Sequence, residues 1–243
     1  MTSEEKAKIR RRWKRWLDVI GNEIGWLLTS HDIFDDIQKI VKDNVNIQSP
    51  GLIYRWITVN YSVRVSVTIR RLTDRDKRTI SLYRLIQDIS QNPHVITRDY
   101  FVSKYSKDMQ ELDCANSDFN HFANKKSREV SQYKLQKDMN RLLSDTKRIR
   151  TFTDKWIAHF DTDRRRYVVP TYLDVSNALQ DIDRIYCRYC LLLTCSGLIT
   201  RKPALQYDWK EPLRHPWIEM SDKVKNWRLR QGKAVWDKRE SNS

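Results

Sequence analysis

Apolar residues recur every three to four positions along most of the chain, which is the spacing of one face of an α-helix. The first such stretch runs from about residue 4 to residue 30, and its apolar positions include Trp13 and Trp16. The string Ser30-His31-Asp32 then predicts the start of a second, shorter helix, with a surface position for its histidine. The N-terminal part of the chain is therefore predicted to be helical.

Residues 52–72 allow two interpretations. Five β-branched residues nearly alternate there, as in a strand: Val59, Val63, Val65, Val67 and Ile69. However, the stretch is about 20 residues long, and strands in globular proteins are usually 3–10 residues long. Its length favours a helix.

Two shorter helices are expected beyond residue 72. Thr79 or Ser81 is a suitable N-cap for the first, and Asn92-Pro93-His94 would end it. The second is expected over residues 97–113.

A long helical stretch is expected to begin at Ser117-Asp118 and to lead to His159, with a break near Thr146. Its first part, residues 120–138, is strongly polar and is predicted to project into solvent or to cover a partner. Pro170-Thr171 then opens a closing helix. The chain has only 5 glycines and 6 prolines, which disfavours sheets with tight hairpins. The predicted fold class is all-α, a helical bundle.

The composition changes near residue 198. Residues 1–198 are predicted to form the helical domain, and residues 199–243 a basic, Trp-containing C-terminal arm that docks or folds on its partner. No apolar run approaches the ~20 residues that span a bilayer, and the N-terminus lacks the apolar segment of a signal peptide. A cytoplasmic location with no membrane partner is expected.

The formal net charge is +15 and the sequence pI is about 9.7. A protein this basic attracts polyanions, and nucleic acid is the partner that the charge favours. The alternative is that much of this charge only solvates the surface.

No metal or cofactor is expected. Cys187 and Cys190 have the spacing of half a zinc site, but no second pair follows, so reduced structural thiols are predicted. The chain also lacks a Gly-rich phosphate loop, a His-Glu-x-x-His motif and a serine-hydrolase elbow.

Residues 148–161 are the stretch that suggests chemistry. At 100° per residue, Arg148, Lys155 and His159 share one narrow strip of a helix, next to an apolar strip that would pack inward. Such a strip suits an anionic ligand. A carboxylate, Asp161, lies two residues after the histidine. The alternative is structural, with His159 capping the end of its helix by donating to the final carbonyls.

Three consecutive arginines, Arg164, Arg165 and Arg166, follow this stretch. Beside a candidate site they could hold a phosphate backbone. A solvated run of charge is the alternative.

The string Asp154-Lys155-x-x-Ala158-His159-x-Asp161 resembles the signature of HEPN domains, and most closely that of the abortive-infection U-type (AbiU-like) branch. The order of the pieces agrees, because segments like residues 69–74 and 79–86 precede it and a closing helix follows Pro170. The resemblance covers about residues 4–198. It implies an HEPN-like helical bundle in a bacterial phage-defence or toxin-type system, with a homodimer, RNA as substrate, and a cognate antitoxin or other defence protein as a possible partner.

The resemblance also implies roles for individual residues in a metal-independent endoribonuclease. His159 would move the proton, Lys155 and Arg148 would stabilise charge on the phosphate, and Asp161 would orient the imidazole or the loop. The chain departs from the family pattern, because none of residues 152–154 is the usual arginine. Either Lys155 or Arg148 supplies that charge, or the copy has lost the reaction. In the second case it would be an inactive HEPN scaffold that binds RNA or a partner protein, or a regulated subunit whose basic surface meets an acidic protein.

Overall fold

The computed structural model describes residues 1–48, 51–105, 108–159, 161–163 and 166–215. Within these ranges the chain forms eight α-helices and no β-strand, so the prediction of an all-α bundle is confirmed. The α-helices are α1 (Ser3–Asp43), α2 (Leu52–Leu72), α3 (Leu82–Gln91), α4 (Arg98–Val102), α5 (Met109–Asn120), α6 (Gln132–Asp145), α7 (Lys147–Phe152) and α8 (Tyr172–Thr194). The short helices are η1 (Val45–Ile47), η2 (Pro93–Val95), the π-helix η3 (Thr153–Ala158) and η5 (Glu211–Arg214).

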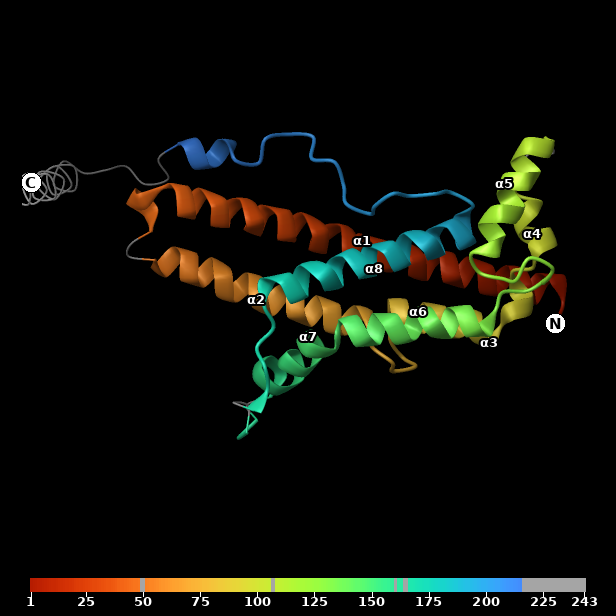
Figure 1. Cartoon of the computed structure of the whole chain (residues 1–243), viewed down its shortest axis with the longest axis horizontal. Coiled ribbons are helices and arrows are strands. Elements are labelled where there is room, and N and C mark those ends of the chain that lie inside the picture. The colour runs from red at the N-terminus through yellow and green to blue at the C-terminus, as the bar shows by residue number, and fades with distance from the viewer. Residues whose placement is uncertain (49–50, 106–107, 160, 164–165, 216–243) are drawn as a thin grey trace, which may run out of the picture. The chain divides into compact units, whose positions relative to one another are not determined.

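Helix α1 is one continuous helix of 41 residues, so the predicted second helix at residue 30 is wrong (Figure 1). The Ser30 hydroxyl donates to the Trp26 carbonyl at 2.7 Å inside the same helix, and therefore caps no new one. His31 is half-buried, not a surface residue, because its ring lies between those of Tyr61 and Tyr172. At the N-terminus, Thr2 forms a capping box that starts the helix.

Residues 52–72 form helix α2, as their length predicted. Val65, Ile69 and Leu72 are buried, and their spacing of three to four residues places them on one face of the helix. Ser81, one of the two expected caps, accepts a hydrogen bond from the backbone N–H of Arg84 and starts α3.

The segment between residues 97 and 131 differs from the prediction. In place of one helix over residues 97–113 there are two, α4 and α5, and the predicted helix start at Ser117-Asp118 lies inside the last turns of α5. Residues 120–138 do not project into solvent, because Phe122 and Leu135 are fully buried. Arg98 holds this region together by donating to the backbone carbonyls of Ser127, Asn116 and Asn124.

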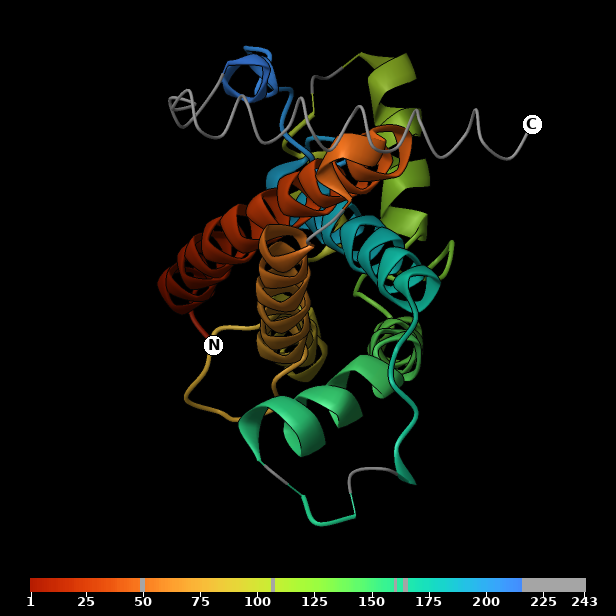
Figure 2. The same cartoon turned by 90° about the vertical axis from the view of Figure 1, so that its left-hand side faces the viewer.

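Helices α1, α3, α6 and α8 enclose the core (Figure 1 and Figure 2). Helix α8 packs on α1 and α6, α3 packs on α6, and α7 packs on α2. The expected break at Thr146 separates α6 from α7, and Thr171 caps α8 with a capping box to Asp174. Helix α8 ends at Cys195, whose φ of 58° lies in the left-handed region.

The chain divides into two compact units, residues 1–203 and 204–243. Residues 200–203 belong to the first, where the backbone N–H of Arg201 donates to Asp183 at 2.8 Å and Lys202 pairs with Asp32. The second unit is described to residue 215; there Arg214 pairs with Asp208 at 2.7 Å. The predicted boundary at residue 198 stays a prediction, and the expected features from Pro216 onward lie outside the described residues. Among the helices described, none is long and apolar enough to cross a bilayer.

Candidate functional site

The stretch that carries the histidine is not an α-helix to its end. Helix α7 continues into the π-helix η3, in which each turn holds more residues than an α-turn. The buried hydroxyl of Thr153 lies 2.8 Å from the Ile149 carbonyl and 3.1 Å from the Ser66 carbonyl, which ties the junction to α2. Single π-turns inside helices occur frequently at functional sites.

His159 directly follows the π-helix in extended backbone, with φ −134° and ψ 139°. Its side chain is exposed, and it forms no hydrogen bond or ion pair with any residue that the structure describes. The alternative of a helix cap, with the imidazole donating to the final carbonyls, is therefore not seen among those residues. The ring is accessible to a ligand.

Lys155 and Asp161 form an ion pair of 2.7 Å on either side of His159 in sequence. The backbone N–H of Asp161 also donates to the Lys155 carbonyl at 3.3 Å, which closes the turn around the histidine. The hydrogen bond from Lys155 lowers the pKa of Asp161, and the same bond raises the pKa of Lys155. At neutral pH both groups are therefore charged, and the cation stays beside the exposed imidazole. Asp161 binds Lys155 here and not the ring.

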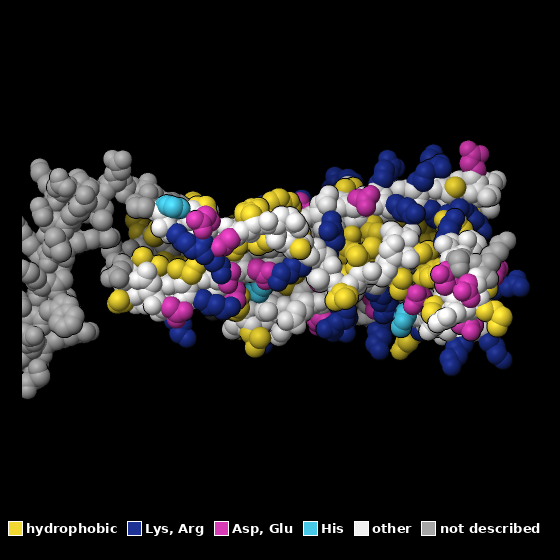
Figure 3. Space-filling model, turned by 90° about the horizontal axis from the view of Figure 1, so that it is seen from above, with side chains coloured by type: hydrophobic (Ala, Val, Ile, Leu, Met, Phe, Trp, Pro, Cys, Tyr) yellow, Lys and Arg dark blue, Asp and Glu magenta, His cyan; other side chains and the backbone are white. Residues whose placement is uncertain are grey.

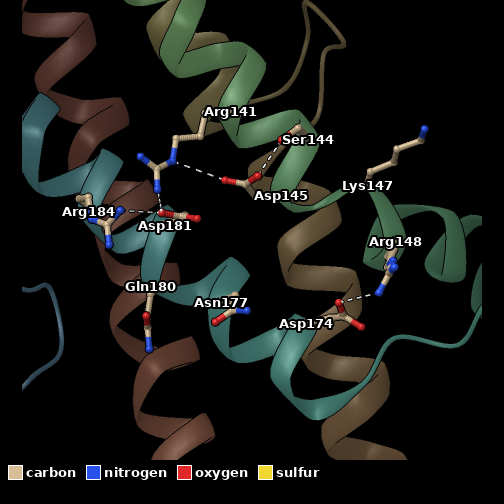
Figure 4. A pocket seen from close by; sticks show the side chains of 10 residues that line it. All are labelled: Arg141, Ser144, Asp145, Lys147, Arg148, Asp174, Asn177, Gln180, Asp181 and Arg184. Atoms are coloured by element: carbon tan, nitrogen blue, oxygen red, sulfur yellow. Dashed lines mark hydrogen bonds and ion pairs between the residues drawn. The ribbon is translucent and has the colours of Figure 1, made fainter.

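Arg148 has a carboxylate partner on another helix. It pairs with Asp174 at the start of α8, at 3.0 Å (Figure 4). The predicted strip assumed 100° per residue, and the wider π-turn from Thr153 onward changes the direction in which the later side chains point. The predicted role of Arg148 in phosphate binding stays a prediction.

Arg148 lines a polar groove of about 520 Å³ between α6, α7 and α8 (Figure 4). Arginine and aspartate side chains alternate along it: Arg141 contacts both Asp145 and Asp181, and Arg184 pairs with Asp181 at 2.9 Å. Every arginine of the groove thus has a carboxylate partner inside it.

The arginine run beyond the site is described only at its end. Arg166 is exposed and pairs with Asp163 at 3.4 Å. Arg164 and Arg165 lie outside the described residues, so their predicted phosphate contacts stay predictions.

Three arginines that the sequence did not mark as a group come together beside the π-helix. Arg70 of α2 donates to Asp154 at 3.1 Å, one residue before Lys155. Arg150 of α7 is half-buried, and its pKa is lowered first by burial and then by the nearby charges of Arg75 and Arg70. We call Arg70, Arg75 and Arg150 the arginine cluster. The only sequence signal for it was that residues 69–74 belong to the HEPN-like pattern.

The cysteines do not form a metal site. All four are free thiols, and burial raises the pKa of Cys187 to about 12, so this thiol stays protonated. Within the described ranges no group of three or more His, Cys, Asp or Glu residues is placed to hold a metal ion.

Basic side chains are spread over the surface shown in Figure 3, with acidic side chains between them. No single patch on that face identifies a binding site. The candidate site therefore depends on the exposed His159 and the ion pair that flanks it in sequence, and not on the basic surface.

Comparison with known proteins identifies a family for the chain. The family model for AbiU2, an HEPN family, matches residues 11–214 and so includes the whole candidate site. No curated protein and no solved structure matches the chain.

Proposed function

Since the chain belongs to the AbiU2 family of HEPN proteins, an abortive-infection family, we propose that it is a metal-independent endoribonuclease of a bacterial phage-defence or toxin-type system. The observation that carries the proposal is the exposed side chain of His159, which lies in sequence between the two members of the Lys155–Asp161 ion pair. In this role it cleaves RNA in the cytoplasm, under the control of a cognate antitoxin or another defence protein.

The reaction needs a proton acceptor, a proton donor and a cation. One histidine takes the proton of the ribose 2′-hydroxyl, and the 2′-oxygen attacks the adjacent phosphorus. The bond from phosphorus to the 5′-oxygen breaks, and that oxygen receives a proton from a second histidine. The products are a 2′,3′-cyclic phosphate and a 5′-hydroxyl. Lys155 stabilises the negative charge that develops on the phosphate, and Asp161 keeps Lys155 charged and in place.

The arginine cluster is a second source of positive charge. The usual family arginine is missing at residues 152–154, and Arg70 and Arg150 approach the site from the neighbouring turns of α2 and α7. Each guanidinium group can donate two parallel hydrogen bonds to a phosphate, whereas the ammonium of a lysine acts as a point charge. They would hold the RNA backbone beside His159.

A second copy of the chain would supply the second histidine. Helix α2 exposes an apolar stripe at helical spacing, which includes Leu52 (76% exposed), Trp56 (62%), Val59 (53%) and Val63 (40%). Exposed apolar side chains on one helix face are typical of a protein interface. Further along the same helix lies Arg70, so a symmetric dimer through this stripe would bring two candidate sites to one interface.

The test is cleavage of a mixed cellular RNA pool in EDTA. The wild type should give fragments that end in 2′,3′-cyclic phosphate, and His159→Ala should lower the rate by about 10²–10⁴-fold, the usual contribution of an acid–base group. His121→Ala is the matched control, because this exposed histidine lies at the end of α5. Light scattering on the same samples reports whether the protein is a dimer.

Equal cleavage by the wild type and His159→Ala would overturn the assignment of His159. Intact RNA in every sample, with RNA still bound, would favour the second candidate function, an inactive HEPN scaffold that binds RNA or a protein. The missing arginine at residues 152–154 is the observation that supports this alternative.

A further inference from the structure

A cavity of about 230 Å³ lies on the other side of the helix that carries the candidate site. Its walls come from α1, α2, α7, the start of α8 and residues 169–171. Five of the lining residues are aromatic: Phe34, Tyr54, Tyr61, Phe152 and Tyr172. Drug-sized ligands occupy pockets of about 300–1,000 Å³, so this cavity suits a ligand of one small ring system.

The aromatic walls are held in place by one another. Phe34 and Tyr61 stack with ring centroids 3.9 Å apart and planes within 8°, and Phe34 is almost fully buried. Phe152 closes the cavity from the side of α7 and stacks at 6.0 Å on Trp156, a residue of the π-helix. A ring bound in the cavity would therefore lie next to the segment that leads to His159.

Two neighbouring hydroxyls of the lining, on Thr58 and Ser62, offer hydrogen-bond acceptors. The Thr58 hydroxyl donates to the Tyr54 carbonyl at 2.9 Å, and the Ser62 hydroxyl donates to the Thr58 carbonyl at 2.7 Å. Because each hydroxyl has a single proton, both present only lone pairs to a ligand. Gln38 adds an amide that can donate and accept.

The cavity is lined by no Lys, Arg, Asp or Glu among the residues described, so it suits an uncharged ring and not a phosphate. The phosphate-binding cations lie outside it, at Lys155 and the arginine cluster. This separation of a neutral aromatic cavity from external cations matches the two parts of a nucleotide, its base and its backbone.

We propose that this cavity binds one base of the RNA substrate and prefers bases that carry an exocyclic amino group. The inference rests on the proposed ribonuclease function for the identity of the ligand. Adenine, cytosine and guanine can donate an amino proton to the lone pairs of Thr58 and Ser62, whereas uracil has no amino group. Stacking against the aromatic walls contributes to the binding of every base.

The test is titration of the full chain with cytidine, adenosine and uridine, followed by calorimetry or ligand-observed NMR. The wild type should bind cytidine or adenosine at least about fivefold more tightly than uridine, as expected for one or two hydrogen bonds. The double variant Thr58→Val, Ser62→Ala should bind all three nucleosides equally, at the level of uridine. Ser30→Ala is the matched control: its hydroxyl also donates back along a helix, at 2.7 Å, and it does not line the cavity.

The nucleoside titrations test the base site separately from the ribonuclease proposal, because a nucleoside can bind without any RNA being cleaved. His159→Ala should bind nucleosides as the wild type does. Nucleoside binding without RNA cleavage would overturn the ribonuclease proposal and keep the cavity as a base site. Cleavage without any nucleoside binding, or an equal loss in Ser30→Ala, would overturn the base site. Where RNA is cleaved, the double variant should also lose any preference for amino-bearing bases beside the cut.

Discussion

Two cation–aspartate groups of the chain have similar components and opposite surroundings. At the candidate site, Lys155 pairs with Asp161 at the surface, at 2.7 Å. Between α6 and α8, Arg188 pairs with Asp138 at 3.0 Å, and the side chain of Asp138 is only 10% exposed. The comparison separates charge that can bind a ligand from charge that holds the fold together.

In the buried group, Arg188 and Asp138 form hydrogen bonds with other residues of the protein. The Tyr189 hydroxyl donates to the second oxygen of Asp138 at 2.9 Å, and Arg188 also donates to the backbone carbonyl of His121. Burial raises the pKa of Asp138 and also that of the fully buried Tyr189. These contacts connect α6, α8 and the end of α5.

In the exposed group, a ligand can replace Asp161 as the partner of Lys155. Lys155 is 41% exposed and its ammonium has three donors, and the side chain of His159 is exposed. A phosphate can therefore displace or share the partner of Lys155 at little cost, since surface ion pairs contribute only about 0–1 kcal/mol. Basic residues therefore indicate a binding site only where a ligand can replace their carboxylate partners.

The largest expected effect is on the buried group. Asp138→Ala should lower the free energy of unfolding by about 3 kcal/mol, because it leaves Arg188 without its carboxylate and the buried Tyr189 hydroxyl without its acceptor. Urea denaturation measures this change. A loss below about 1 kcal/mol would mean that the buried pair does not hold the fold, and the contrast with the surface pair would fail.

A smaller effect, on activity alone, is expected at the surface group. Lys155→Met should slow RNA cleavage about tenfold, less than the 10²–10³-fold of a buried oxyanion donor, because the lysine is exposed. Its unfolding free energy should change by less than about 1 kcal/mol. Lys39→Met is the control, since Lys39 forms a similar surface pair with Asp35 away from the site. If both variants cleave RNA like the wild type, Lys155 has no role in the reaction.

The smallest effect is a difference in pH dependence. The folded pKa of Asp138 lies above the ordinary 3.8, so the folded state binds more protons just above that pH, and stability falls as pH rises through this window. The folded pKa of Asp161 lies below 3.8, so its contribution is present above that pH and is lost as pH falls.

The measurement is the unfolding free energy of the wild type, Asp138→Asn and Asp161→Asn from about pH 2.5 to pH 6. As pH rises, the advantage of the wild type over Asp138→Asn should shrink, and its advantage over Asp161→Asn should grow. The same slope for both variants would show that the two carboxylates do not differ in environment.

The sequence predicted those parts of the fold that depend on local chemistry. The caps at Ser81 and Thr171, the break at Thr146 and the helix over residues 52–72 follow from hydrogen-bonding side chains and from the spacing of apolar residues. The helical class and the HEPN family were also predicted, because they depend on long patterns that single exceptions do not change.

Other parts depend on contacts between distant residues and could not be predicted. Arg98 organises residues 116–127 by binding their carbonyls, a role that no spacing in the sequence indicates. The ion pair of Arg70 and Asp154 joins α2 to η3 across 84 positions of the chain. The π-turn before His159 lies where Thr153 bonds to the Ser66 carbonyl of α2, a contact between residues 87 positions apart that the helical spacing does not indicate.

The π-helix also has a consequence for insertions and deletions. A π-turn is equivalent to one extra residue placed in an α-helix, and it shifts everything beyond it by roughly 100° around the axis. Removal of Trp156 or Ile157 would return the segment to α-helical register and keep the proposed side chains of the reaction, Lys155, His159 and Asp161. The chain that carries His159 and Asp161 would then continue from a different face of the helix. Relatives that differ by one residue here are therefore expected to present the same motif to another side of the molecule.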